Sequence, residues 1–159
     1  MSLHDWLLFL HVATAFMLVS ALVLFTYLII GGRSLSVPSD VVRMFRISRV
    51  GDALMGIGSI GVLVFGVWLA IEVDGYELWD GWIIAAIVLW LIFGAVGSRL
   101  GRVYYAARDR AKARVAEGRD EPDPELNAML RSQTGLVLHL TTVAVALVLL
   151  IIMIYKPGA

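Results

Sequence analysis

Four apolar stretches dominate the sequence, and each is long enough to cross the hydrocarbon core of a bilayer as a helix, which takes about 20 residues. The stretches cover roughly residues 6–30, 52–71, 82–105 and 135–155. Hydrophobic residues make up 60% of the chain and the mean hydropathy is +0.85, well above the range of soluble domains. The sequence therefore predicts an all-α fold, a four-helix transmembrane bundle that takes up residues 1–159 as a single domain.

The basic residues predict how this bundle is oriented. Of the 13 Lys and Arg residues, all except Lys156 lie between the first two predicted helices or between residues 99 and 131. The hairpin EVDGYELWDG between helices two and three has no basic residue and contains Glu72, Asp74, Glu77 and Asp80. Because basic loops stay in the cytoplasm, we expect an up-down-up-down, multi-pass bundle with both termini outside. The aromatic residues support the same orientation, in which Tyr104 and Tyr105 are expected at the inner interface of the membrane.

Composition excludes several classes of function. The formal net charge is zero, so the sequence predicts no nucleic-acid partner. The chain has no cysteine, which removes disulfides, thiolate metal sites and iron–sulfur clusters. It also lacks a phosphate-binding glycine loop, a nucleophile elbow and a pair of histidines on one helical turn. We therefore predict no catalytic residue and no cluster of metal ligands.

Two basic links join the helices on the predicted cytoplasmic side. The first contains DVVRMFRISRV, and two interpretations are open: a short amphipathic helix on the membrane surface, capped by Ser39 or Asp40, or an extension of helix two. The second is an arm of about residues 106–134, which should continue helix three to about Gly118 and break at Pro122 and Pro124. The arm is interpreted either as a docking site for a partner or anionic lipid, or as a solvated hairpin.

Small residues predict which helices pack closely. Helix two contains five glycines, and helix three contains several small residues between Gly94 and Gly101. In lipid, apolar burial does not drive helices together, whereas small residues let two backbones approach. We therefore expect helix two in the middle of the bundle, packed closely against helix three.

Two histidines inside the predicted spans raise the hypothesis of a haem held between them. Polar residues within a membrane are costly and mark candidate sites, and paired imidazoles can hold a haem in a bundle. The predicted topology places His11 near the outer surface and His139 near the inner one. At 1.5 Å rise per residue they lie roughly 20 Å apart along the membrane normal, compared with roughly 4 Å across the two axial ligands of one iron. A haem shared by both residues is therefore not expected.

Each histidine then has its own candidate partners. For His11 the alternatives are haem ligation, with Met153 as the second axial ligand, or a hydrogen bond that ties helix one to a neighbouring helix. At the inner boundary, we expect an ion pair between Asp52 and Arg99 with His139 nearby, which together form a structural polar cluster.

Three stretches carry a resemblance to known families: WLLFLHVATAFMLVSALVLF, GVLVFGVWLA and LWDGWIIAAIVLWLIFGAVG. They resemble a group of small, uncharacterised bacterial four-helix integral membrane proteins. More distantly, they are similar to the membrane part of copper-resistance D-type proteins and to the bacterial four-helix protoporphyrinogen oxidases. The matching positions are Leu10 with His11, and Gly66 to Trp68. The resemblance implies the bacterial cytoplasmic membrane as the location and haem b at His11. Helix three lacks the lysine found in the oxidases, so their activity is not implied.

Two main hypotheses for function follow, beside a minor one of a transporter that uses Asp52 and His139 and needs an oligomer, because four helices enclose little space for a path. The first is a haem-associated redox protein in which His11 is an axial ligand. The second is a non-enzymatic scaffold, or an accessory subunit of a larger membrane complex, in which the arm makes the contacts. In both cases the expected partners are the lipid bilayer and either further copies of the chain or other membrane subunits.

Overall fold

The computed structural model describes residues 2–73 and 75–157, so Asp74 of the acidic hairpin lies outside the described residues. The elements in the described part are all helices: α1 (Leu3–Gly32), α2 (Pro38–Glu72), α3 (Gly81–Ala116), α4 (Pro124–Leu130) and α5 (Gln133–Tyr155). Four helical segments are long and apolar enough to cross a bilayer: α1, α2, α3 and the stretch from α4 through α5. The predictions of an all-α fold and of four spans are confirmed.

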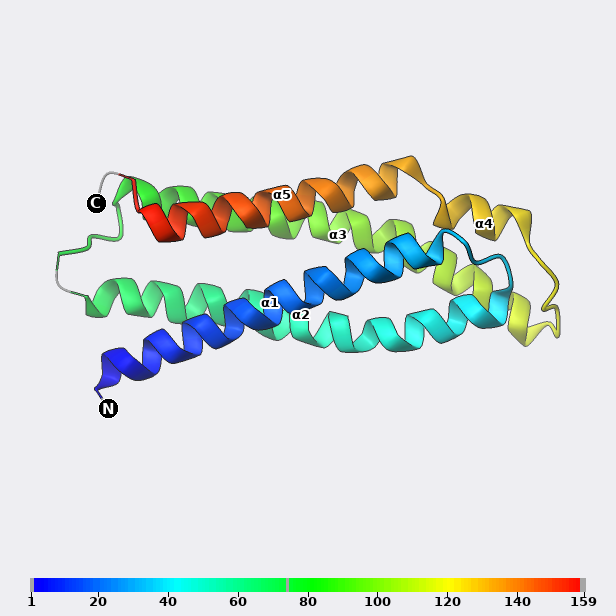
Figure 1. Ribbon diagram of the computed structural model, residues 1–159, viewed down its shortest axis with the longest axis horizontal. Helices are drawn as coiled ribbons and strands as arrows, with labels where there is room; N and C mark the ends of the chain where they lie inside the picture. The colour runs from blue at the N-terminus through cyan, green and yellow to red at the C-terminus, as the bar shows by residue number, and fades with distance from the viewer. Residues whose placement is uncertain (1, 74, 158–159) are drawn as a thin grey trace.

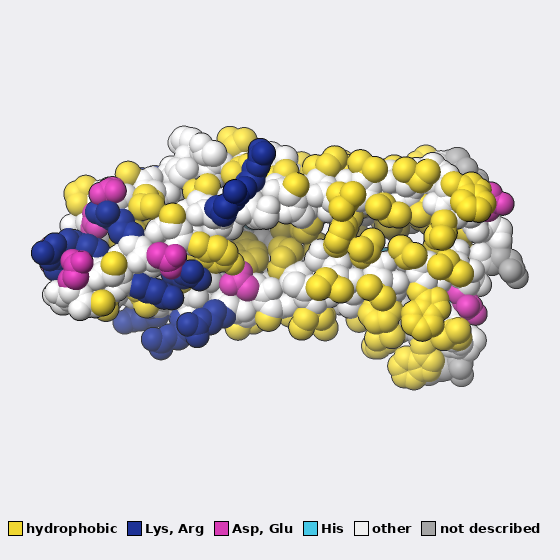
Figure 2. All heavy atoms as spheres, turned by 180° about the vertical axis from the view of Figure 1, so that it is seen from behind, with side chains coloured by type: hydrophobic (Ala, Val, Ile, Leu, Met, Phe, Trp, Pro, Cys, Tyr) yellow, Lys and Arg dark blue, Asp and Glu magenta, His cyan; other side chains and the backbone are white. Residues whose placement is uncertain are grey.

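The four long helices form two layers (Figure 1). α1 packs along α2 in one layer, and α5 packs along α3 in the other. Successive long helices run in opposite directions, and both chain termini lie at the same end as the connection between α2 and α3, which we call the hairpin end. Most Lys and Arg side chains gather at the other end, which we call the basic end (Figure 2). Which side of the membrane each end faces stays a prediction.

α2 and α3 extend beyond the predicted spans at the basic end. They contain 35 and 36 residues, which corresponds to about 53 Å of helix, compared with about 30 Å for the hydrocarbon core of a bilayer. The segment DVVRMFRISRV is thus the first part of α2, and the alternative of a separate surface helix is wrong. Pro38 begins the helix because its ring presets the backbone angle and its missing N–H needs no partner there.

The cap of α2 also differs from the prediction. Val37, not Ser39 or Asp40, is the residue that precedes the helix, and its side chain makes no capping bond. The Ser39 amide instead donates to the carboxylate of Asp120 in the arm, at 2.8 Å. A negative charge at this position is favourable because the N-terminus of a helix carries a partial positive charge.

The glycines of α2 pack against α1, which corrects the expectation that they bring α2 close to α3. A methyl group added at Gly58 would lie 2.7 Å from the backbone nitrogen of Leu18, and one at Gly61 would lie 2.3 Å from the Thr14 side chain. On α3, a methyl group at Gly97 would meet nothing within 4 Å. Close backbone approach therefore joins α1 to α2, while the small residues of α3 leave open space.

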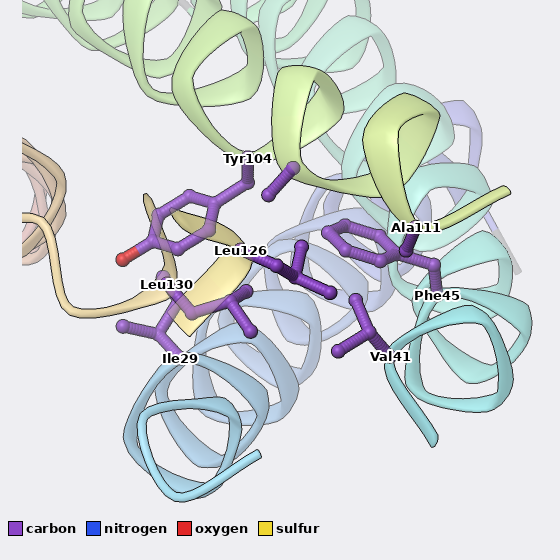
Figure 3. Packing of buried hydrophobic residues seen from close by; sticks show 8 residues of the cluster. Ile29, Val41, Phe45, Tyr104, Ala111, Leu126 and Leu130 are labelled. Atoms are coloured by element: carbon purple, nitrogen blue, oxygen red, sulfur yellow. The ribbon is translucent and has the colours of Figure 1, made fainter. Parts of the chain in front are cut away.

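The arm packs into the bundle through α4 and the last turns of α3, and only residues 115–122 fit the interpretation as a solvated hairpin, because all of them are exposed. α4 lies across the basic end, where Leu126 and Leu130 are 0% and 1% exposed. Figure 3 shows these two residues in a cluster with side chains from α1, α2 and α3: Ile29, Val41, Phe45, Tyr104, Ala107 and Ala111. Leu126 and Leu130 are four residues apart and so share one face of a single helical turn, a pattern too short to stand out in a charged segment.

Asp123 fixes the position of α4. It is 4% exposed, and its carboxylate caps the helix by accepting from the amides of Glu125 and Leu126. The same carboxylate accepts from Nε and Nη2 of Arg110 on α3, at 2.9 and 3.2 Å. These bonds from Arg110 lower the pKa of Asp123 below its usual value. The Asp123 amide donates to the carbonyl of Ser36 at 3.0 Å, which ties the arm to the α1–α2 link.

Candidate functional site

A cavity of about 390 Å³ lies between the two layers, in the half of the bundle nearer the basic end. All five helices contribute to its wall, which is mostly apolar and includes Leu22 and Phe25 of α1 and Phe93 of α3. Small-molecule sites are commonly clefts of about 300 to 1,000 Å³ with largely apolar walls. This cavity is therefore the candidate functional site.

The cavity opens sideways between α2 and α3. Exposed residues that line it form the rim of this opening: Gly56, Ile60, Gly94, Ser98 and Tyr105. Figure 2 shows this face of the molecule hollowed between the two layers, beside the gathered Lys and Arg side chains. The membrane surrounds this face of the bundle, whereas α4 lies over the basic end. The cavity is thus more accessible from the bilayer than from the aqueous end.

Two hydrogen bonds between α2 and α3 bracket the opening. Toward the hairpin end, Trp90 Nε1 donates to the carbonyl of Ser59 at 3.0 Å. Toward the basic end, the Tyr105 hydroxyl donates to the carboxylate of Asp52 at 2.9 Å. Trp90 and Tyr105 lie about 22 Å apart along α3 at 1.5 Å per residue. Along α2 the same two bonds lie only about 10 Å apart, from Ser59 to Asp52, so the opening narrows toward α2.

His139 places a hydrogen-bond acceptor in the cavity wall. The residue is 2% exposed, and its Nε2 atom lies 2.8 Å from the hydroxyl of Thr26 on α1. The Thr26 hydroxyl has one proton, which it donates to the Leu22 carbonyl at 2.8 Å, so it accepts the bond from Nε2–H. Nδ1 then carries a lone pair, and within the described residues it has no hydrogen-bond partner.

Tyr104 supplies the matching donor. The residue is 8% exposed and lines the cavity, and no described residue bonds its hydroxyl. Figure 3 shows its ring beside Leu130, with the hydroxyl turned away from the apolar cluster. The hydroxyl packs against Gly135 of α5, where an added methyl group would lie 2.9 Å from the hydroxyl oxygen. The Tyr104 hydroxyl and His139 Nδ1 are both fully buried, so each is a polar group without its usual partner, and a ligand atom or water can reach it only after a small movement of the surrounding side chains.

The predicted polar cluster is brought together only in part. Asp52 and His139 line the same cavity, as the cluster requires. Arg99 is exposed, and it is Tyr105 that bonds the Asp52 carboxylate. In the described part of the chain, no ion pair joins Asp52 to Arg99.

Three residues of the site were missed in the sequence: Thr26, Tyr104 and Tyr105. The two tyrosines were interpreted as interface anchors, which is the usual role of aromatic residues at membrane boundaries. All three have hydroxyl groups inside the predicted spans 6–30 and 82–105. A hydroxyl group at that depth in a membrane needs a hydrogen-bond partner, and this need could have identified the three residues as candidates.

His11 and Met153 do not line this cavity. His11 Nδ1 donates to the carbonyl of Val62 on α2 at 3.1 Å. The imidazole lies against Gly66, where an added methyl group would lie 2.8 Å from Cε1. Met153 of α5 packs at the hairpin end against the cluster that contains Trp82. Within residues 2–73 and 75–157, no group of three or more His, Asp or Glu is placed to hold a metal ion.

Comparisons with known proteins agree with a membrane location. Residues 5–157 match the family described as "Predicted integral membrane protein (DUF2269)". No curated protein and no solved structure matches the chain. The family match spans all four long helices and the arm.

Proposed function

The chain belongs to the DUF2269 family of predicted integral membrane proteins, and on that premise we propose that it is a membrane-embedded binding protein for a lipid-soluble molecule. The observation that carries the proposal is the cavity of about 390 Å³, with its opening between α2 and α3. Apolar walls with a few convergent polar groups are typical of ligand sites, and His139 and Tyr104 supply such groups. A lipid-soluble molecule can enter from the bilayer without crossing an aqueous surface.

This proposal develops the non-enzymatic alternative, because a binding protein needs no catalytic residue. It is compatible with the role of scaffold or accessory subunit, since large apolar side chains on the outside of the bundle, such as Phe16 and Ile154, are exposed. In a bilayer such side chains contact lipid, a second copy of the chain or another membrane subunit. We place the protein in the bacterial cytoplasmic membrane with its basic end inside, because basic segments are retained in the cytoplasm.

Filling the opening should displace the bound molecule. Gly97 lines the cavity and an added methyl group there meets nothing within 4 Å, so the larger side chain of Gly97→Leu should extend into the cavity. Native mass spectrometry of protein purified in mild detergent should show a lipophilic adduct on the wild type. We expect about tenfold less adduct on Gly97→Leu, which corresponds to about 1.4 kcal/mol of lost binding free energy.

Gly31→Leu is the control, because an added methyl group at Gly31 also meets nothing within 4 Å and Gly31 lies outside the cavity lining. This variant should keep the adduct at the wild-type level. A wild-type protein without an adduct, or equal adduct levels on all three proteins, contradicts the proposed function.

Haem binding at His11 is the second candidate function. The observation that favours it is the bond from Nδ1 to Val62, because such a bond orients a ligating imidazole and leaves the Nε2 lone pair free. The same bond also ties α1 to α2, and the close fit of the ring against Gly66 supports this tether. A porphyrin needs an apolar slot beside its ligand, and the large cavity is lined by His139 and not by His11. No redox step is therefore derived.

The colour of the protein distinguishes the two roles of His11. Haem b at His11 predicts a Soret band in protein from haem-replete cells, lost in His11→Ala and kept in His139→Ala. With Met153 as the second ligand, Met153→Leu should shift the band. The tether, which we favour, predicts colourless wild-type protein and a lower unfolding temperature for His11→Ala. A Soret band that depends on His11 would overturn the tether as the sole role of this residue.

A further inference from the structure

A second cavity of about 120 Å³ lies beside the first, toward the basic end. Four basic side chains line it, two from α2 and two from α3: Arg46, Arg49, Arg108 and Lys112. We call this cavity the basic pocket. Phe45, Ser48 and Asp52 line both cavities, so the two are adjacent. Asp52 is the one acidic residue among the described residues of the pocket wall, and its carboxylate accepts a bond from Tyr105.

The charge of the basic pocket is largely uncompensated by the protein. Arg108 lies 2.9 Å from Asp109. Across residues 2–73 and 75–157, no carboxylate lies within 4.0 Å of Arg46, Arg49 or Lys112. Three other basic residues of the arm are paired with acids: Arg110, Arg114 and Arg119. A concave site with four cations beside one hydrogen-bonded carboxylate is suited to an anion.

The basic pocket lies at the depth of lipid headgroups. Arg46 and Arg49 precede the predicted span 52–71 by one to two turns, and Arg108 and Lys112 follow the predicted span 82–105 by similar distances. The adjoining large cavity lies within the membrane-spanning part of α2 and α3. The two cavities together therefore cross the boundary between hydrocarbon and headgroup, as a lipid does.

We propose that the protein binds a phosphate-bearing lipid, with an acyl chain in the large cavity and the phosphate in the basic pocket. This inference rests on the proposed function and names the chemical class of its ligand. Arg and Lys form strong charge-assisted hydrogen bonds with phosphate oxygens, and basic pockets between transmembrane helices bind anionic headgroups. Tyr104 lies one helical turn before Arg108, about 6 Å along α3. After a small movement, its buried hydroxyl can donate to an ester carbonyl, the group that links each acyl chain to the glycerol of a phospholipid.

A comparison of phosphatidic acid with diacylglycerol tests this inference, because the two lipids share their acyl chains and differ in the phosphate. Delipidated protein should bind phosphatidic acid at least about tenfold more tightly than diacylglycerol, as measured by native mass spectrometry. The double variant Arg49→Gln/Lys112→Gln should reduce the binding of phosphatidic acid by a similar factor. Gly97→Leu should also reduce it, because the acyl chain then loses its cavity.

The control double variant is Arg43→Gln/Arg102→Gln, which removes the same charge from exposed positions of α2 and α3 outside the basic pocket. It should bind phosphatidic acid as the wild type does. Equal binding of both lipids, with sensitivity to Gly97→Leu, overturns the phosphate inference and leaves the proposed function intact. Failure of the wild type to bind either lipid counts against both. Displacement of phosphatidic acid by equimolar inorganic phosphate identifies a free-phosphate site and overturns the lipid assignment.

Discussion

Replacing Asp123 with alanine should release the arm from the basic end of the bundle. The substitution removes the N-cap of α4 and leaves Arg110 and Arg114, which are 32% and 21% exposed, without the carboxylate they share. Arg110 keeps Glu125 and Arg114 keeps Glu121 as a partner, so the lost cap dominates and should lower the free energy of opening the arm by about 1–2 kcal/mol. Amide hydrogen exchange in α4 should then accelerate by about tenfold.

Asp109→Ala is the control for this prediction, because the Asp109 carboxylate is 64% exposed and pairs with Arg108 on the surface. This substitution should change the free energy of opening α4 by no more than about 0.5 kcal/mol.

Acid should weaken the attachment of the arm in the wild type, as Asp123→Ala does. The bonds from Arg110 lower the folded-state pKa of Asp123, so its contribution is complete above the unfolded pKa of about 3.9 and is lost as the pH falls through the lower folded value. Unchanged exchange in Asp123→Ala at neutral pH contradicts the anchoring role.

Alanine at Gly58 should separate α1 from α2, whereas alanine at Gly56 should not. A methyl group at Gly58 would lie 2.7 Å from the Leu18 nitrogen and 2.9 Å from the Thr14 carbonyl oxygen. Both are backbone atoms that cannot rotate away, so the helices must shift, at a cost of about 2–3 kcal/mol. At Gly56 nothing lies within 4 Å, and alanine should be neutral or stabilising by up to about 1 kcal/mol because it favours helix over glycine.

Unfolding in mixed detergent micelles with increasing SDS measures both variants under the same conditions. Gly58→Ala should unfold at a lower SDS fraction than the wild type, and Gly56→Ala at the same or a higher fraction. Equal destabilisation by both substitutions is the result that excludes close packing of α1 against α2 at this position.

The spans were predictable because hydropathy and charge are local properties of the sequence. Which helices pack together was not predictable, because a small residue permits the close approach of another helix without identifying that helix. The glycines of α2 and those of α3 form similar patterns, yet only Gly58 of α2 meets a neighbouring backbone, at Thr14 and Leu18 of α1. The partner is decided by which side chains α1 and α3 present to α2, and that depends on how all the helices are rotated in the bundle.

The candidate site was predictable to a similar extent. Asp52 and His139 stood out because a polar group inside a span needs a partner. The cavity that these two residues line could not be predicted, because its volume depends on the separation of α2 and α3, which no local pattern specifies. The contribution of the arm was hidden for a related reason. Its anchor depends on two leucines and one aspartate, and most of the remaining residues in that segment are charged or polar.

The arm also bears on the order in which the protein is made. α1 and α2 fit together through contacts between neighbouring segments, so this pair can form as soon as it enters the membrane. The first turn of α2, however, takes its cap from Asp120, and the cluster beneath α4 needs Leu126 and Leu130. These residues leave the ribosome only after α3 has been synthesised. The wall of the cavity is therefore completed late in biosynthesis, and a chain that stops before α4 should insert its first helices yet hold no ligand.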